Sequence, residues 1–120
     1  MRITLCGSAR FEEDFHSWNE DLSLSGHTVY SLAIYPSSKG GNKDWYNQQQ
    51  KTTLDLVHLS KIENSDAIVV INKNGYIGDS TKREIEWARL KNKTIYFVEP
   101  VDGAGWPADA LLPGGEAHLR

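Results

Sequence analysis

Only one cysteine, Cys6, occurs among the 120 residues. A single thiol excludes both an intrachain disulfide and a metal site built from several cysteines, and it is typical of a reducing compartment. No apolar run approaches the roughly 20 residues of a transmembrane helix. The N-terminal run "MRITLCGSAR" is too short in its apolar part for a signal peptide. We therefore expect a cytoplasmic protein with no membrane partner.

Positive charge is also limited. The chain has 13 Lys and Arg against 16 Asp and Glu, a net charge of -3, and no basic cluster forms a stripe. Proteins that bind duplex nucleic acid concentrate positive charge on one surface, so we expect no duplex partner. The four histidines lack metal-ligand spacing, and we expect neither a metal nor a cofactor; they are His16, His27, His58 and His118.

The sequence does contain alternating strand and helix patterns. Hydrophobic residues make up 39% of the chain and charged residues 24%, as in a globular domain. We expect strands at 2–6, 27–34, 66–72 and 94–99, and helices at about 11–22, 45–64 and 80–91. The second helix is expected to bury Thr52, Leu56, Leu59 and Ile62, and residues 36–44 are expected to form a loop.

This order predicts one α/β domain over residues 1–120. The nearly continuous apolar run "DAIVVIN" is typical of a strand buried on both faces of a parallel sheet. Right-handed crossovers then give a three-layer, Rossmann-like (flavodoxin-like) domain with a mainly parallel sheet. We expect the first strand to lie next to the third, as it does if the strand order is 2-1-3-4. Residues 100–120 are expected to be an irregular tail with a short turn near 108–112.

In such a sheet, ligands bind beyond the carboxyl ends of the strands where the strand order reverses. The first loop there is "GSAR", residues 7–10. Gly7 lets the backbone approach a ligand closely, Ser8 offers a hydroxyl, and Arg10 offers a planar fork for phosphate. An ordinary strand-to-helix turn, with Ser8 as the helix N-cap, explains the same residues equally well.

The second loop, "GYIGDST", contains two glycines three residues apart, followed by an acid and two hydroxyls at a helix start. This composition suits a phosphate or a sugar, and it gives further candidate binding residues: Gly75, Tyr76, Gly78, Asp79 and Ser80. Trp45 and Tyr46 are candidates to stack on a base, or residues that anchor a loop on the core.

Glu84 has two possible roles in the following helix. With Thr81 it matches the capping box T-x-x-E, which explains it completely. Alternatively it is catalytic: at about 100° per residue it lies about 40° from Ala88, at the edge of the expected core face. Arg83 and Glu86 are expected to face solvent. Asp66 is either a turn residue that opens the third strand or a second site carboxylate.

The segments "LCGSAR", "SDAIVVI" and "GYIGDSTKREIEWA" together resemble the nucleoside 2-deoxyribosyltransferase superfamily, over about residues 2–98. Within it, the short nucleoside 5'-monophosphate N-glycoside hydrolases are the most similar. The resemblance implies cleavage of an N-glycosidic bond, by hydrolysis or 2-deoxyribosyl transfer, on a small nucleoside or nucleotide. It also implies a homo-oligomer, Glu84 as the nucleophile, Asp66 near the sugar, and a phosphate loop formed by Gly7, Ser8, Ala9 and Arg10 with Ser80.

The chain departs from the family pattern in two places. The transferases often carry a tyrosine near the end of the first strand, where this chain has Leu5-Cys6-Gly7, and Arg83 precedes Glu84 where the family often has a tyrosine. Two alternatives therefore stay open. One is a non-catalytic nucleotide-binding module. The other is a lysine-decarboxylase-like phosphoribohydrolase, although its glycine-rich signature is not matched.

Overall fold

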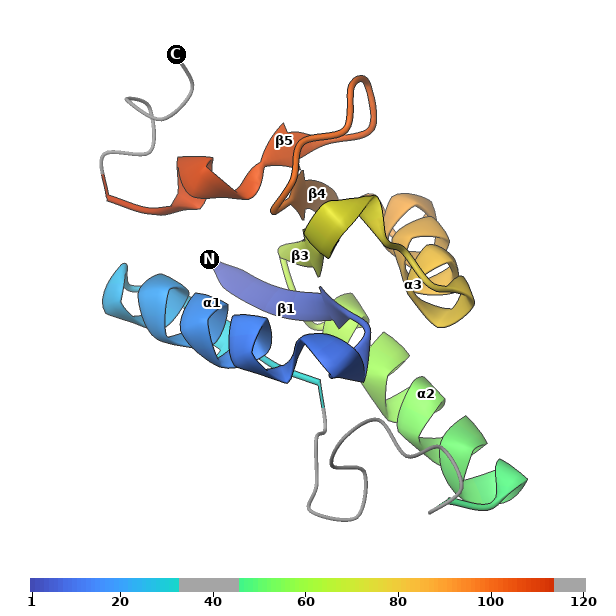
Figure 1. Ribbon diagram of the computed structural model, residues 1–120. Coiled ribbons are helices and arrows are strands. Elements are labelled where there is room, and N and C mark those ends of the chain that lie inside the picture. The colour runs from blue at the N-terminus through green and yellow to red at the C-terminus, as the bar shows by residue number, and fades with distance from the viewer. Residues whose placement is uncertain (33–45, 114–120) are drawn as a thin grey trace.

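The computed structural model describes residues 1–32 and 46–113. Within these residues a parallel sheet runs in the order β2-β1-β3-β4-β5 (Figure 1). Among the helices of this part of the chain, none is both long and apolar enough to cross a membrane. The elements are β1 (Arg2–Gly7), η1 (Ala9–Phe11), α1 (Glu12–Leu24), β2 (Thr28–Tyr30), α2 (Gln48–Glu63), β3 (Ala67–Ile71), η4 (Lys73–Gly75), α3 (Asp79–Leu90), β4 (Thr94–Phe97), β5 (Trp106–Pro107) and η5 (Ala108–Leu111), where η denotes a 3-10 helix.

Helices cover both faces of the sheet, as Figure 1 shows. Side chains alternate between the faces of a strand, so β1 and β3 each contribute to two cores. On one face, α1 packs Phe15 and Leu22 against β1 and β3. On the other face, α2 and α3 pack Ile62 and Ile85 against the same strands and β4. The predicted three-layer α/β fold with a parallel sheet is therefore confirmed.

The expected pairing of the first strand with the third is also confirmed, because β1 lies between β2 and β3, and β4 follows β3 in the order considered above. The expected irregular tail was wrong in one respect: it adds β5, in which Trp106 pairs with Tyr96 and Pro107 with Phe97. Proline lacks a backbone N–H and is tolerated at such an edge position. The turn expected near 108–112 is present as η5.

The inner face expected for the second helix was wrong in its first half. It begins at Gln48, after Asn47, whose side chain accepts a hydrogen bond from the Gln50 amide at 2.8 Å. Thr52 and Leu56 are exposed, against expectation, and Leu56 retains 61% of its accessible surface. Ile62 is buried and Leu59 partly buried, as expected, and the further buried position is His58, four residues before Ile62. The apolar residues misled the prediction because the inner face of α2 includes a histidine.

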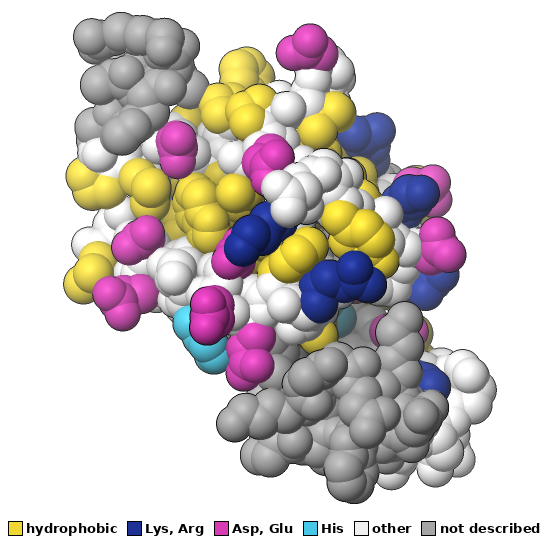
Figure 2. All heavy atoms as spheres, in the orientation of Figure 1, with side chains coloured by type: hydrophobic (Ala, Val, Ile, Leu, Met, Phe, Trp, Pro, Cys, Tyr) yellow, Lys and Arg dark blue, Asp and Glu magenta, His cyan; other side chains and the backbone are white. Residues whose placement is uncertain are grey.

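The other boundaries differ by smaller amounts. The second strand pairs only at Thr28–Tyr30, and α3 begins at Asp79, one residue earlier than expected. The expected loop at 36–44, the end of the second strand and Trp45 lie outside the described residues. On the face shown in Figure 2, basic and acidic side chains lie interspersed among apolar ones.

Candidate active site

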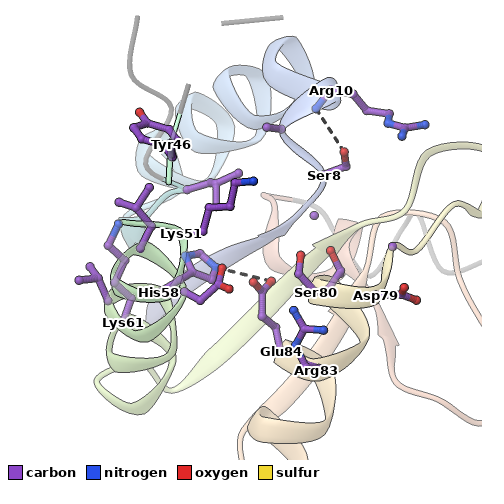
Figure 3. A pocket seen from close by; sticks show the side chains of 18 of the residues that line it. Ser8, Arg10, Tyr46, Lys51, His58, Lys61, Asp79, Ser80, Arg83 and Glu84 are labelled. Carbon is purple, nitrogen blue, oxygen red and sulfur yellow. Dashed lines mark hydrogen bonds and ion pairs between the residues drawn. The ribbon is translucent and has the colours of Figure 1, made fainter. Parts of the chain in front are cut away.

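A cavity of about 630 Å³ lies at the carboxyl end of β1, between α2 and the start of α3 (Figure 3). Pockets of this size accommodate drug-sized ligands. Three segments form most of its lining, and Leu32 and Tyr46 complete it. The segments are the end of β1 with η1 (Gly7, Ser8, Ala9, Arg10), the start of α3 with the loop before it (Tyr76, Gly78, Asp79, Ser80, Thr81, Arg83, Glu84), and α2 (Lys51, Leu54, Asp55, Val57, His58, Lys61).

Of the candidate site residues that the structure describes, all but Gly75 and Asp66 line this cavity. The two loops meet because β1 and β3 are neighbours in register, with Gly7 beside Ile71 at their carboxyl ends. Gly75 does not line the cavity; it lies in η4 with φ of 77° and forms the turn that carries the second loop. Tyr46 does line it, as expected for a residue near a base or a loop anchor.

Asp66 is the other exception. It precedes β3 at the amino end of the sheet, away from the cavity, and is exposed. Its Oδ2 accepts a hydrogen bond from the Arg2 amide at 2.8 Å, and its Oδ1 lies 3.7 Å from the Arg2 guanidinium. This amide, with the Arg2 charge, lowers the pKa of Asp66. The structure therefore supports the turn-residue interpretation of Asp66 and does not bring it near Glu84.

The first loop is held against the second. Gly7 has φ of 152°, and a Cβ there would lie 2.9 Å from the Ile71 carbonyl oxygen, so the close approach requires glycine. Ser8 accepts a hydrogen bond from the Arg10 amide at 3.3 Å and caps η1. The Arg10 guanidinium lies 4.3 Å from the centre of the Tyr76 ring and donates to the Tyr76 hydroxyl at 3.4 Å. Ser8 is thus both a cap and a cavity residue.

The start of α3 excludes the capping-box explanation of Glu84. The N-cap is Gly78, which has no side chain, and no side-chain cap bond forms there. Thr81 lies inside the helix with 2% of its surface exposed, two residues beyond the Asp79 start. The first backbone amides of α3 therefore donate no capping bond to a side chain at the N-cap position. Because the start of α3 lines the cavity, these N–H groups favour an anion there.

Glu84 lies one turn further along α3, with 7% of its surface exposed. In Figure 3 its carboxyl group and the His58 ring point towards each other, and Glu84 Oε1 lies 3.7 Å from His58 Nε2. Burial raises the pKa of Glu84 to about 8. Burial, with the nearby charge of Lys61, lowers the pKa of His58 to about 4. At neutral pH the two groups are therefore a protonated acid beside a neutral imidazole.

Sequence reasoning missed the contribution of α2 to this site. His58 was not among the candidate site residues because the histidines lack metal-ligand spacing, yet it lies beside both Glu84 and Cys6, whose Sγ is 3.6 Å from Nε2. The four-residue spacing from Leu54 through His58 to Ile62 is the signal that would have found it. Arg83 was expected to face solvent, but although exposed it lines the cavity. Helix register alone did not show how close α2 comes to α3.

Comparison with protein-family models and with curated protein sequences finds no match. Among solved structures, the chain is similar to a 2-deoxyribosyltransferase from Bacillus psychrosaccharolyticus, with 20% identity and a TM-score of 0.58 over 81% of this chain and 71% of that one. It is also similar to the CMP N-glycosidase BcmB from Clostridium botulinum, with 24% identity and a TM-score of 0.47 over 81% and 70% of the two chains. The chain therefore shares the fold of the Bacillus 2-deoxyribosyltransferase.

Proposed function

We propose that this protein cleaves the N-glycosidic bond of a nucleoside or nucleoside 5'-monophosphate, with Glu84 as the nucleophile. The observation that carries the proposal is a buried carboxyl group that lines a cavity of nucleoside size and serves no helix cap. The shared fold with a 2-deoxyribosyltransferase supports the same reaction class. Because burial keeps Glu84 out of bulk water, its carboxylate would be poorly solvated and reactive towards a developing sugar cation.

The proposed reaction has two steps. The Glu84 carboxylate attacks the anomeric carbon of the sugar, and the N-glycosidic bond breaks with its electron pair leaving on the base, which takes up a proton. The resulting glycosyl ester is then attacked at the same carbon by water, which gives hydrolysis, or by a nitrogen of a second base, which gives transfer. Either attack restores the Glu84 carboxylate.

A phosphate has suitable partners some distance from Glu84. In Figure 3 Ser8 and Ser80 lie between Glu84 and Arg10, whose side chain extends away from the carboxyl group. Ser80 also lies in the first turn of α3, where backbone amides favour an anion. We place the 5'-phosphate near Ser8, Arg10 and Ser80, with the sugar between them and Glu84.

The protonation state of Glu84 favours a second candidate function, a nucleotide-binding module without catalysis. With a pKa of about 8, Glu84 is mostly a neutral acid at pH 7. A neutral acid can donate a hydrogen bond to a bound ligand, but it cannot attack an anomeric carbon. In the catalytic proposal, the carboxylate is the reactive minor form, so kcat/KM of the free enzyme rises as the pH approaches 8.

A panel of ribo- and deoxyribonucleosides and their 5'-monophosphates distinguishes the two functions. Each compound is incubated with the full chain, with and without a second free base, and released base and new nucleoside are separated by chromatography. Release of base supports the enzyme, and exchange of bases identifies transfer. Binding of a nucleotide by calorimetry without release of base from any compound would favour the binding module.

A further inference from the structure

Three side chains of types that can bind metal ions lie close together beside the cavity, and they come from three different elements. Cys6 lies on β1, His58 on α2 and Glu84 on α3, and all three are buried. One ligand atom from each lies within 4.8 Å of the other two. Cys6 Sγ is 3.6 Å from His58 Nε2, which in turn is 3.7 Å from Glu84 Oε1.

Hydrogen bonds alone leave this cluster incompletely satisfied. His58 Nε2 faces both the thiol and the carboxyl group, and one ring nitrogen can form a good hydrogen bond to only one of them. Among the described residues, Glu84 Oε1 has no hydrogen-bond partner although it is buried. A buried polar atom without a partner is unfavourable by roughly 1–3 kcal/mol. The cluster therefore contains a buried carboxyl oxygen without a hydrogen-bond partner, 3.7 Å from the His58 ring nitrogen.

We propose that Cys6, His58 and Glu84 bind a zinc ion. Zinc takes thiolate, imidazole and carboxylate ligands, and its bond lengths of about 2.0–2.3 Å put the ligand atoms of a tetrahedral site about 3.3–3.6 Å apart. The separations of 3.6 Å between Cys6 Sγ and His58 Nε2 and of 3.7 Å between His58 Nε2 and Glu84 Oε1 come close to this spacing. The thiolate and carboxylate together balance the 2+ charge, and the softness of the thiolate favours zinc over magnesium or calcium.

Zinc bound by these three side chains would keep one coordination position free of protein ligands. Glu84 and His58 line the cavity, whereas Cys6 lies beneath it with no exposed surface. Three protein ligands leave a fourth tetrahedral position, which faces the cavity and takes water or a ligand atom. These ligands show no metal-ligand spacing along the chain, because the fold, rather than a local motif, brings them together.

Bound zinc would hold the Glu84 carboxylate and withdraw it from the nucleophilic role. If the proposed function is right, zinc inhibits base release by occupying the same side chain. Zinc binding itself does not depend on that function, because it is measured directly as metal uptake. The two proposals can therefore fail separately.

The test uses the full chain after treatment with a chelator that is then removed. Zinc uptake is measured by equilibrium dialysis and elemental analysis, and cobalt(II) replaces zinc as a spectroscopic probe. A thiolate bound to cobalt gives a charge-transfer band in the near ultraviolet, and tetrahedral cobalt gives strong visible bands. We expect about one ion per chain and both signatures in the wild type.

Three variants and a matched control locate the site. Cys6→Ser should abolish the charge-transfer band, while His58→Gln and Glu84→Gln should each weaken zinc binding by more than about tenfold, since even outer-shell changes cost that much. His16→Gln should change nothing, because His16 forms a similar contact with Glu12, 3.6 Å, on the surface.

Circular dichroism checks that each variant folds, and the two glutamine variants decide the result if Cys6→Ser does not fold. Uptake of less than half an ion per wild-type chain, cobalt binding without a thiolate band, or undiminished uptake by the glutamine variants would each overturn the proposal.

Discussion

The buried Glu84 carboxyl group should make the protein less stable as the pH rises from 6.5 to 8. Its pKa is raised from 4.5 to about 8. The folded state therefore holds a proton that the unfolded chain has already released in this range. The stabilisation from this group is complete below pH 4.5 and is lost as the pH rises to about 8.

His58 acts in the opposite direction over a lower range. Its pKa falls from 6.5 to about 4 on burial, so its contribution is present above pH 6.5 and is lost as the pH falls towards 4. The two effects oppose each other between 4.5 and 6.5, and above 6.5 only Glu84 acts. At about 1.4 kcal/mol per pH unit, the free energy of unfolding should fall by about 2 kcal/mol between pH 6.5 and 8. For a chain of this size that lowers Tm by roughly 8 °C.

The assay is thermal unfolding of the metal-free protein at pH 6.5 and 8, for the wild type and Glu84→Gln. The glutamine amide does not titrate, so the variant should not show the decrease in the free energy of unfolding that Glu84 causes between pH 6.5 and 8. Contributions from groups that do not interact with Glu84 cancel when the pH-dependent change of the variant is subtracted from that of the wild type. Equal changes in the two proteins would show that Glu84 does not carry a raised pKa. The description of Glu84 as shielded from bulk water would then be wrong.

Three further predictions test the geometry of the cavity. Arg10→Ala should weaken binding of a nucleoside 5'-monophosphate by about 10- to 100-fold, the loss of a charged hydrogen bond, and leave nucleoside binding nearly unchanged. Lys82→Ala, on the exposed side of α3, is the control, and equal losses for both ligands in calorimetry would remove the phosphate role. Gly7→Ala should lower the free energy of unfolding by about 1–3 kcal/mol, because the added Cβ meets the Ile71 carbonyl oxygen; urea unfolding with no loss would refute the close approach. Asp66→Asn should leave base release within about twofold of the wild type, because this exposed residue lies at the other end of the sheet; a large loss would restore the role that the family resemblance gave it.

The central position of β3 and both cavity loops could be predicted because each rests on a local signal. The apolar run at 67–71 can lie only in the middle of a sheet covered on both sides, and glycine loops after β1 and β3 then meet at one edge. The position of Glu84 followed from helix periodicity once the helix was placed. These inferences needed only the chain direction and the alternation of side chains.

The α2 wall of the cavity could not be predicted in the same way. Its inner face carries His58 among apolar neighbours, and Leu56 and Val57 are exposed, so apolar periodicity found Ile62 but not His58. Contact between His58 and Glu84 depends on how α2 packs against α3, which no short motif encodes. Asp66 was expected near the sugar, but it precedes β3 and therefore lies at the amino end of the sheet. The cavity loops follow the strands and lie at the opposite, carboxyl end.

Base release by wild type, Glu84→Gln and Glu86→Gln tests the central claim most directly. Glu86 lies two residues further along α3, is exposed and does not line the cavity, so its variant controls for a lost carboxylate on the same helix. The account predicts that Glu84→Gln remains folded and loses activity by roughly a thousandfold or more, while Glu86→Gln stays close to the wild type. Full activity in a folded Glu84→Gln protein would contradict the assignment of the nucleophile.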